Sequence, residues 1–172
     1  MILPSVTRIL APFSDFSKIR PDVLEAAAAK GTRVHAACAL ICKGGWPVVA
    51  PEEQGYVDSF LRWFSRVEQV HHIEEEFRDE AMGFMGHPDL VVTWEGRSMV
   101  VDLKTPVGLQ KLWELQLAGY GHLVRKGTAV EAVATLQLDP QGGIPKAHYV
   151  KNEAQAFAAF FAALQVWRYL ND

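Results

Sequence analysis

The sequence predicts an α/β (α+β) fold in which a mixed central β-sheet is flanked by helices. Helical patterns stand before and after a strand-rich middle, and no repeat, low-complexity segment or linker-like change of composition divides the chain. The 172 residues, of which 49% are hydrophobic, suffice for one core with a shaped cleft. We therefore expect a single domain over residues 1–172.

Helices are recognised by the spacing of their apolar residues and by the residues at their ends. The first spans 20–44, with Pro21 at its first position and Gly44 at its end, and Gly31 is a candidate break between two helical pieces. The others are expected over residues 51–67, 109–127 and 152–170.

Strands are expected over residues 69–77, 83–94, 98–105, 129–138 and 146–150. Glu95-Gly96 has the composition of a two-residue hairpin loop, which would pair Trp94 with Arg97. Continuing that register places Asp89 opposite Asp102, with Cβ atoms roughly 5 Å apart. Lys104 lies two residues beyond Asp102 and so on the same face of the sheet.

Two opposed carboxylates in a buried sheet destabilise the fold unless a cation compensates them. A divalent ion such as Mg²⁺ prefers hard oxygen ligands and keeps sites for water and a phosphate. Lys104 would then stabilise the attacking water or the charge on the phosphorane. The alternative is a surface ion pair of Asp102 and Lys104 on an exposed strand, with Asp89 serving a turn. The apolar runs "LVV" and "MVV" beside them argue against exposure.

Charge and hydropathy argue against a highly basic nucleic-acid-binding protein and against a membrane protein. The formal charge of −3 argues against binding of a polyanion by bulk charge, so nucleic acid would need a local patch or bound cations. No run of 18 apolar residues and no signal-peptide pattern is present, so we expect a soluble, cytoplasmic protein without a membrane partner.

The two cysteines, Cys38 and Cys42, suit a reducing compartment better than a disulfide framework. Together with His35 they fall on one helical stripe, which leaves a zinc site as a minor alternative. No convincing fourth ligand follows, and small residues on a packed helix explain the cysteines equally well.

Four short motifs then occur in order. "GHPD", twelve residues and "DLK" resemble the PD-(D/E)XK nuclease superfamily in its D-x-K form. "KGTRVHAA" around His35 is similar to the G-T-x-x-H segment of the RecB-like, CRISPR-associated and phage-type exonuclease branch, and "QLAGY" resembles its downstream Q-x-x-x-Y. The motifs run from Gly31 to Tyr120, about half of the chain.

The resemblance implies a restriction-endonuclease-like core and a DNA exonuclease that hydrolyses phosphodiester bonds with Mg²⁺ or Mn²⁺, one ion or two. It implies catalytic roles for Asp89, Asp102 and Lys104. The metal ligands would be His35, the two carboxylates and the Leu103 backbone carbonyl. Without the motif context, His35 would be read as an ordinary histidine on a half-buried helix.

Gln116 and Tyr120 are four residues apart and share a helical face. The resemblance implies that they support the lysine or contact a phosphate; a capping amide and a core tyrosine are equally open. Glu74 could match a family glutamate, although a solvated charge run explains "HIEEEF" better. Members of this branch often bind an iron-sulfur cluster through four cysteines. This chain has only two cysteines, so we expect no iron-sulfur cluster. His87 stands where the family often has a small residue.

The expected partner is DNA with single-stranded or double-stranded ends, in repair or recombination of a bacterial or phage-infected cell, and an oligomer stays open. A structure-selective endonuclease of the same fold and a non-catalytic nucleic-acid-binding or assembly subunit are the rival functions. Basic residues able to guide a strand are Arg8, Lys18, Arg20, Lys30, Arg33, Arg125 and Lys126.

Overall fold

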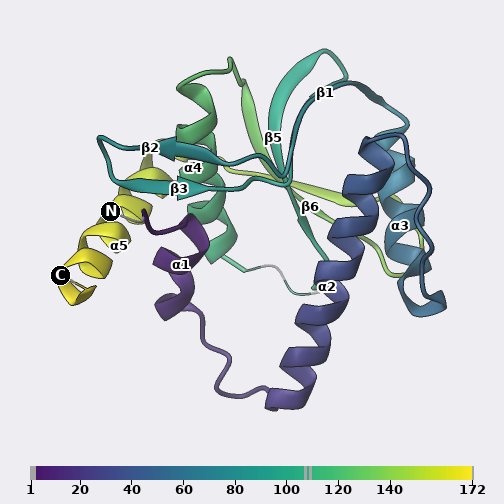
Figure 1. Cartoon of the computed structure of the whole chain (residues 1–172), viewed down its shortest axis with the longest axis horizontal. Coiled ribbons are helices and arrows are strands. Elements are labelled where there is room, and N and C mark those ends of the chain that lie inside the picture. The colour runs from purple at the N-terminus through teal and green to yellow at the C-terminus, as the bar shows by residue number, and fades with distance from the viewer. Residues whose placement is uncertain (1–2, 107, 109, 172) are drawn as a thin grey trace.

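A mixed five-stranded sheet, in the order β1-β4-β5-β6-β7, forms the centre of this α+β protein (Figure 1). The computed structural model describes residues 3–106, 108 and 110–171. The strands of the sheet are β1 (Val67–Ile73), β4 (Leu90–Trp94), β5 (Arg97–Lys104), β6 (Ala132–Gln137) and β7 (Lys146–Tyr149). β5 and β6 are parallel and the other neighbours antiparallel. The predicted mixed sheet flanked by helices is therefore confirmed.

The hairpin of β4 and β5 has the predicted register. Trp94 pairs with Arg97, and the pairing continues to Leu90 with Val101. Glu95 and Gly96 both have positive φ, 48° and 74°, as a two-residue type I′ loop requires. Glycine tolerates this conformation freely, so the local sequence by itself sets the pairing.

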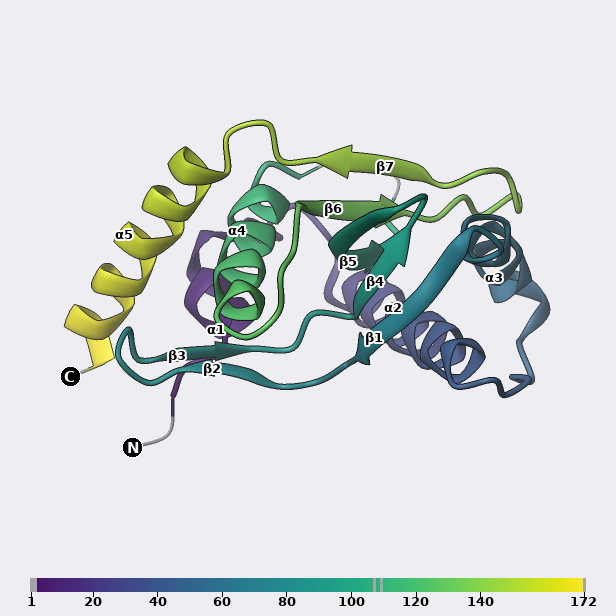
Figure 2. The same ribbon diagram turned by 90° about the horizontal axis from the view of Figure 1, so that it is seen from above.

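A separate two-stranded hairpin, β2 (Phe77–Asp79) and β3 (Phe84–Gly86), leaves the main sheet and runs beside α4 (Figure 2). The single strands predicted over 69–77 and 83–94 are therefore wrong, because each is broken in two. Glu74 adopts a left-handed φ of 50° and turns the chain out of β1. Pro88, which has no N–H for a ladder, lies in the second break.

The described helices are α1 (Val6–Leu10), the short 3₁₀ helix η1 (Ala11–Phe13), α2 (Pro21–Cys42), α3 (Pro51–Phe64), α4 (Leu112–Arg125) and α5 (Glu153–Asn171). α2 continues through Gly31, so the predicted break there is wrong. Glycine costs a helix interior about 1 kcal/mol, too little to interrupt a helix of this length. α1 was not predicted, because five residues are too few to show a helical period.

Two apolar layers cover the two faces of the sheet (Figure 2). α4, α5 and α1 pack on the face that carries Val91, Val100 and Val133. α2 and α3 pack on the face that carries Val101 and Leu103. Since side chains alternate along a strand, the side chains of Asp102 and Lys104 share the face of Val100 and point toward α4.

No helix in the described part of the chain is both long enough and apolar enough to cross a membrane.

Candidate active site

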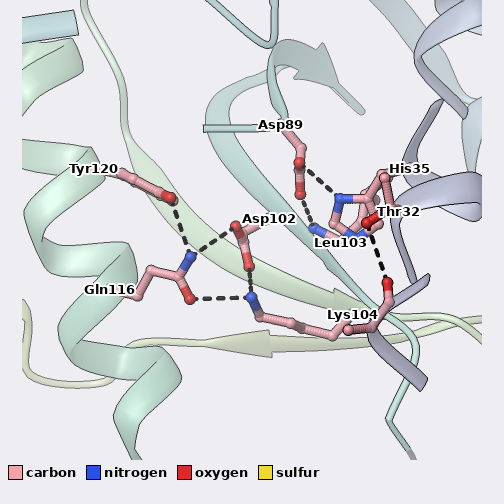
Figure 3. Close-up of polar contacts among 9 residues, drawn as sticks. Thr32, His35, Asp89, Asp102, Leu103, Lys104, Gln116 and Tyr120 are labelled. Atoms are coloured by element: carbon pink, nitrogen blue, oxygen red, sulfur yellow. Dashed lines mark hydrogen bonds and ion pairs between the residues drawn. The ribbon is translucent and has the colours of Figure 1, made fainter. Parts of the chain in front are cut away.

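The two carboxylates of the predicted site lie at the open end of the β4–β5 hairpin, opposite its turn (Figure 3). Asp89 immediately precedes β4, and its Oδ2 accepts a hydrogen bond from the Leu103 backbone N–H at 2.6 Å. Its Oδ1 lies 3.0 Å from His35 Nδ1 on α2. Asp102 lies in β5, and its Oδ2 is 2.7 Å from Lys104 Nζ. The strand pairing ends at Leu90 and Val101, so Asp89 lies just beyond it. Its side chain turns toward α2, whereas the side chain of Asp102 turns toward Lys104 and α4.

Helix α4 contacts this site through the side-chain amide of Gln116. Lys104 Nζ donates to Gln116 Oε1 at 3.0 Å, and Gln116 Nε2 donates to the Tyr120 hydroxyl at 3.1 Å. The same Nε2 lies 3.4 Å from Asp102 Oδ1, at the long end of a hydrogen bond (Figure 3). The predicted shared face of Gln116 and Tyr120 is confirmed. Gln116 fixes the lysine and the buried acid relative to the helix.

The chain approaches α4 closely just before the acid pair. A Cβ on Gly86 would lie 2.7 Å from Tyr120 Cε1 and 3.1 Å from Leu123 Cδ1, both too close for normal packing. Glycine at this position therefore lets the segment leading to Asp89 lie against the Tyr120 ring. Burial raises the pKa of Tyr120, and the negative charge of Asp102 raises it further, so the phenol stays protonated.

Burial dominates the electrostatics of Asp102, whose side chain is 5% exposed. Burial raises its pKa above the usual 3.8; the Lys104 charge opposes this shift, and the Asp89 charge adds to it. Among the described residues, Asp102 Oδ2 accepts no hydrogen bond of regular geometry, although the Lys104 ammonium lies beside it. This oxygen therefore has the Lys104 ammonium as its partner, and a carboxylate oxygen can accept a second cation as well.

His35 is held by Asp89. Burial lowers the pKa of the imidazole, but its hydrogen bond to Asp89 and the charges of Asp89 and Asp102 outweigh burial, so the pKa lies above 6.5. A carboxylate only accepts, so this contact places a proton on Nδ1. The second nitrogen, Nε2, is the one left for another partner.

The donor set suits a hard divalent cation, although its side chains face other partners. Asp89 points toward His35 and Leu103, whereas Asp102 points toward Lys104 and Gln116 (Figure 3). Accordingly, within the described ranges no three His, Cys, Asp or Glu side chains converge in a metal-binding arrangement. The carboxylates, the imidazole and the Leu103 carbonyl are ligands that Mg²⁺ or Mn²⁺ accepts.

Glu74 borders the site at the surface. Its exposed side chain lines, with His35 and Thr32, a cavity of about 400 Å³, and its backbone N–H donates to the Asp89 carbonyl at 2.9 Å. The structure therefore brings Glu74 to the rim of the site and not between the carboxylates.

The zinc alternative finds no support in the positions of the cysteines. Cys38 is fully buried between α2 and α3, and burial raises the pKa of its thiol. Burial also raises the pKa of Cys42 to about 12. Zinc binds the thiolate, which both environments disfavour.

Most of the basic residues proposed to guide DNA have other partners. Arg8 lies over the Trp167 ring, Lys30 over the Tyr56 ring, and Arg20, Arg33, Arg125 and Lys126 pair with Asp22, Glu53, Glu153 and Asp79. These contacts anchor the side chains to the protein surface, so the sequence-based set is a weak guide to a DNA path.

A second buried acid lies away from the site. Asp79 of β2 is paired with His122 of α4 at 2.8 Å and with Lys126, the residue after α4, at 2.7 Å, and it accepts the Met82 N–H at 2.9 Å. Burial raises the pKa of Asp79, but these hydrogen bonds outweigh it and hold the pKa below the usual 3.8. The cluster ties the small hairpin to α4.

Two residues near the site were not predicted. Trp113 of α4 has its ring centroid 5.8 Å from Lys104 Nζ. Thr135 of β6 is the register partner of Asp102 in the parallel pair and is 1% exposed. The helical spacing of Trp113 and Gln116, i and i+3, was a usable signal, whereas the pairing of β5 with β6 left no local trace in the sequence.

No family model matches this chain. No curated protein matches it either. The likeness to PD-(D/E)XK nucleases therefore remains an expectation carried by the motifs.

Proposed function

We propose that this protein is a metal-dependent deoxyribonuclease with a restriction-endonuclease-like core, acting as an exonuclease on DNA phosphodiester bonds. The observation that carries the proposal is the buried ion pair of Asp102 and Lys104, with a second acid, Asp89, at the same end of the β4–β5 hairpin. An ordinary ion pair would need one acid; here a second acid lies across the hairpin, bound to His35 and to the Leu103 N–H.

Asp89, Asp102, His35 and the Leu103 carbonyl would hold Mg²⁺ or Mn²⁺. The bound ion supplies charge neutralisation and a lowered pKa of the attacking water. The chain itself supplies the cation that would act on the substrate, the Lys104 ammonium beside Asp102. Lys104 then donates to the water or to a phosphate oxygen, as a compact point charge does well.

Gln116 and Tyr120 serve as positioning residues in this proposal. Gln116 accepts from Lys104 and donates to Tyr120, so it holds the ammonium on the α4 side of the acid pair. The protonated Tyr120 hydroxyl anchors the amide. Such preorganisation is the main way in which a protein stabilises charge that develops in a transition state.

The test is a gel assay with end-labelled single-stranded and double-stranded DNA, with Mg²⁺, with Mn²⁺ and with neither. We expect metal-dependent release of short products from the labelled end. Asp102→Asn should abolish cleavage, and Asp58→Asn is the matched control, because Asp58 is an exposed acid on α3, away from the site. No cleavage of either DNA with either metal would refute the proposal.

Linear and covalently closed circular DNA separate the rival functions. An exonuclease degrades only the linear form, whereas a structure-selective endonuclease also opens the circle. DNA binding without cleavage of either form would identify a non-catalytic subunit.

A further inference from the structure

The face of the sheet under α4 changes from apolar to polar along β5, β6 and β7. One row of register partners, Val91, Val100, Val133 and the adjacent Val150, is apolar and belongs to the core. The next row continues from Asp102 to Thr135 on β6 and His148 on β7. The row beyond it contains Lys104, Gln137 and Lys146.

Phosphodiester chemistry at the acid pair does not require polar residues on β6 and β7. Asp89, Asp102 and Lys104 all lie on the β4–β5 hairpin, one or two strands away from Thr135 and His148. The polar rows therefore extend about 10 Å beyond β5, which is two strand spacings. Polar rows of this length are expected where a bound polar polymer lies along the sheet.

A cavity of about 1040 Å³ lies over this polar floor. Trp113 and Leu117 of α4 line one side, Thr135 and His148 line the floor, and Lys151 and Gln155 line the end at the first turn of α5. Trp113 also has its ring centroid 5.8 Å from Lys104 Nζ, so this ring connects the cavity wall with the proposed catalytic lysine.

The hydroxyl of Thr135, in the floor of this cavity, is buried without a hydrogen-bond partner among the described residues. The residue is 1% exposed, and its Oγ1 makes no hydrogen bond within the described part of the chain. A buried hydroxyl is normally bonded. His148 is different, since its Nε2 already lies 3.0 Å from Gln137 Oε1.

The end of the cavity suits an anion. α5 is 19 residues long and its first turn lies here, where the helix dipole favours negative charge. Asn152 caps the Gln155 N–H, and the charge of Glu153 in this turn is paired with Arg125. Lys151, which is exposed, adds a cation just before that turn. The other lysine of the lining, Lys111, is paired with Glu114.

We propose that this cavity is a binding groove for single-stranded DNA, which runs from the Trp113 ring beside Lys104 across β6 and β7 to the first turn of α5. The proposal rests on the proposed nuclease function and names the substrate strand that its site takes. A length of about 10 Å covers roughly three phosphates of a stacked strand at 3.4 Å each. Thr135 Oγ1 bonds the strand at the floor, and Lys151 with the α5 N-terminus holds a phosphate.

The experiment measures binding of fluorescein-labelled (dT)12 by anisotropy, in Ca²⁺ and over a series of salt concentrations. Thr135→Val should weaken binding about three- to tenfold, as expected for one hydrogen bond. Its melting temperature should be equal or higher, because valine removes a buried hydroxyl without a partner. Lys151→Ala should weaken binding and reduce the salt slope by about 0.7, the value for one phosphate of a single strand.

The matched controls are Thr93→Val, on the same sheet face but in β4, and Lys43→Ala, an exposed lysine after α2. Both should bind (dT)12 as the wild type does. A (dA)12·(dT)12 duplex should bind more weakly and without dependence on Thr135.

The outcomes separate this groove from the nuclease proposal. Unchanged affinity in both Thr135→Val and Lys151→Ala, or no binding of (dT)12 by the wild type, overturns the groove even where the wild type cleaves DNA. Weakened binding in both variants supports the groove even where no cleavage is found. A duplex that binds equally well and loses the same factor in Thr135→Val overturns the assignment to single strands.

Discussion

Replacing Lys104 by methionine should expose how strongly the acid pair depends on one cation. Methionine keeps most of the volume of the side chain and removes its charge. In the wild type the ammonium lies 2.7 Å from Asp102 Oδ2, and the two side chains are only 17% and 5% exposed. The substitution would leave a buried carboxylate without its counter-charge.

The expected cost follows from this burial. Breaking a buried pair by removing one partner costs about 3–5 kcal/mol, whereas an exposed pair contributes under about 1 kcal/mol. For a chain of this size, 1 kcal/mol shifts the melting temperature by roughly 2–4 °C, so Lys104→Met should lower it by roughly 6–20 °C at pH 8.

The cost should also depend on pH. Burial raises the pKa of Asp102 above the 3.8 of the unfolded chain, and loss of Lys104 raises it further. A raised pKa contributes stability that is fully present below the unfolded pKa and is lost as pH rises through the folded pKa. The variant should therefore be less destabilised at pH 5 than at pH 8.

The assay is urea unfolding followed by circular dichroism at both pH values. Lys111→Met is the control, because it breaks an exposed ion pair with Glu114. The double variant Asp102→Asn with Lys104→Met should recover part of the loss, since it removes both charges. If Lys104→Met costs no more than Lys111→Met at pH 8, the carboxylate does not depend on Lys104 as inferred here.

Four further predictions concern metal, chemistry and folding. Mn²⁺ should raise the melting temperature of the wild type but not of Asp102→Asn, because binding to the native state stabilises it by mass action; an equal response in thermal scans would place the ion elsewhere. His35→Ala should weaken Mn²⁺ binding in calorimetry by at least about tenfold while the protein still folds, and unchanged affinity would leave His35 as a partner of Asp89 alone. Lys104→Ala should lower single-turnover cleavage in saturating Mn²⁺ by about 10² to 10³, and wild-type turnover would remove the lysine from the mechanism. Asp79→Asn should cost about 3 kcal/mol at pH 7 in urea unfolding. Because the folded pKa of Asp79 is depressed, its contribution is present above the unfolded pKa of 3.8 and is lost as pH falls through the folded pKa; a cost that stays constant down to pH 2 would contradict this.

The sequence by itself determined the features that depend on neighbours along the chain. Glu95-Gly96 defines the turn and the register of the hairpin, and the two-residue period of β5 places Lys104 on the same face as Asp102. Gln116 and Tyr120 share a face of α4 for the same kind of reason, the helical period. Local geometry is encoded locally, so these placements could be predicted.

Only the tertiary structure decided which elements meet. The parallel pairing of β5 with β6 brings Thr135 beside Asp102, although 33 residues separate them in the chain. The bend at Glu74 sends β2 and β3 to α4, where Asp79 finds His122 and Lys126. Contacts of this kind arise from burial of apolar faces against one another, a non-directional force that leaves no short-range pattern in the sequence. The acid pair was therefore readable from one hairpin, whereas its surroundings emerged only when the sheet and helices packed together.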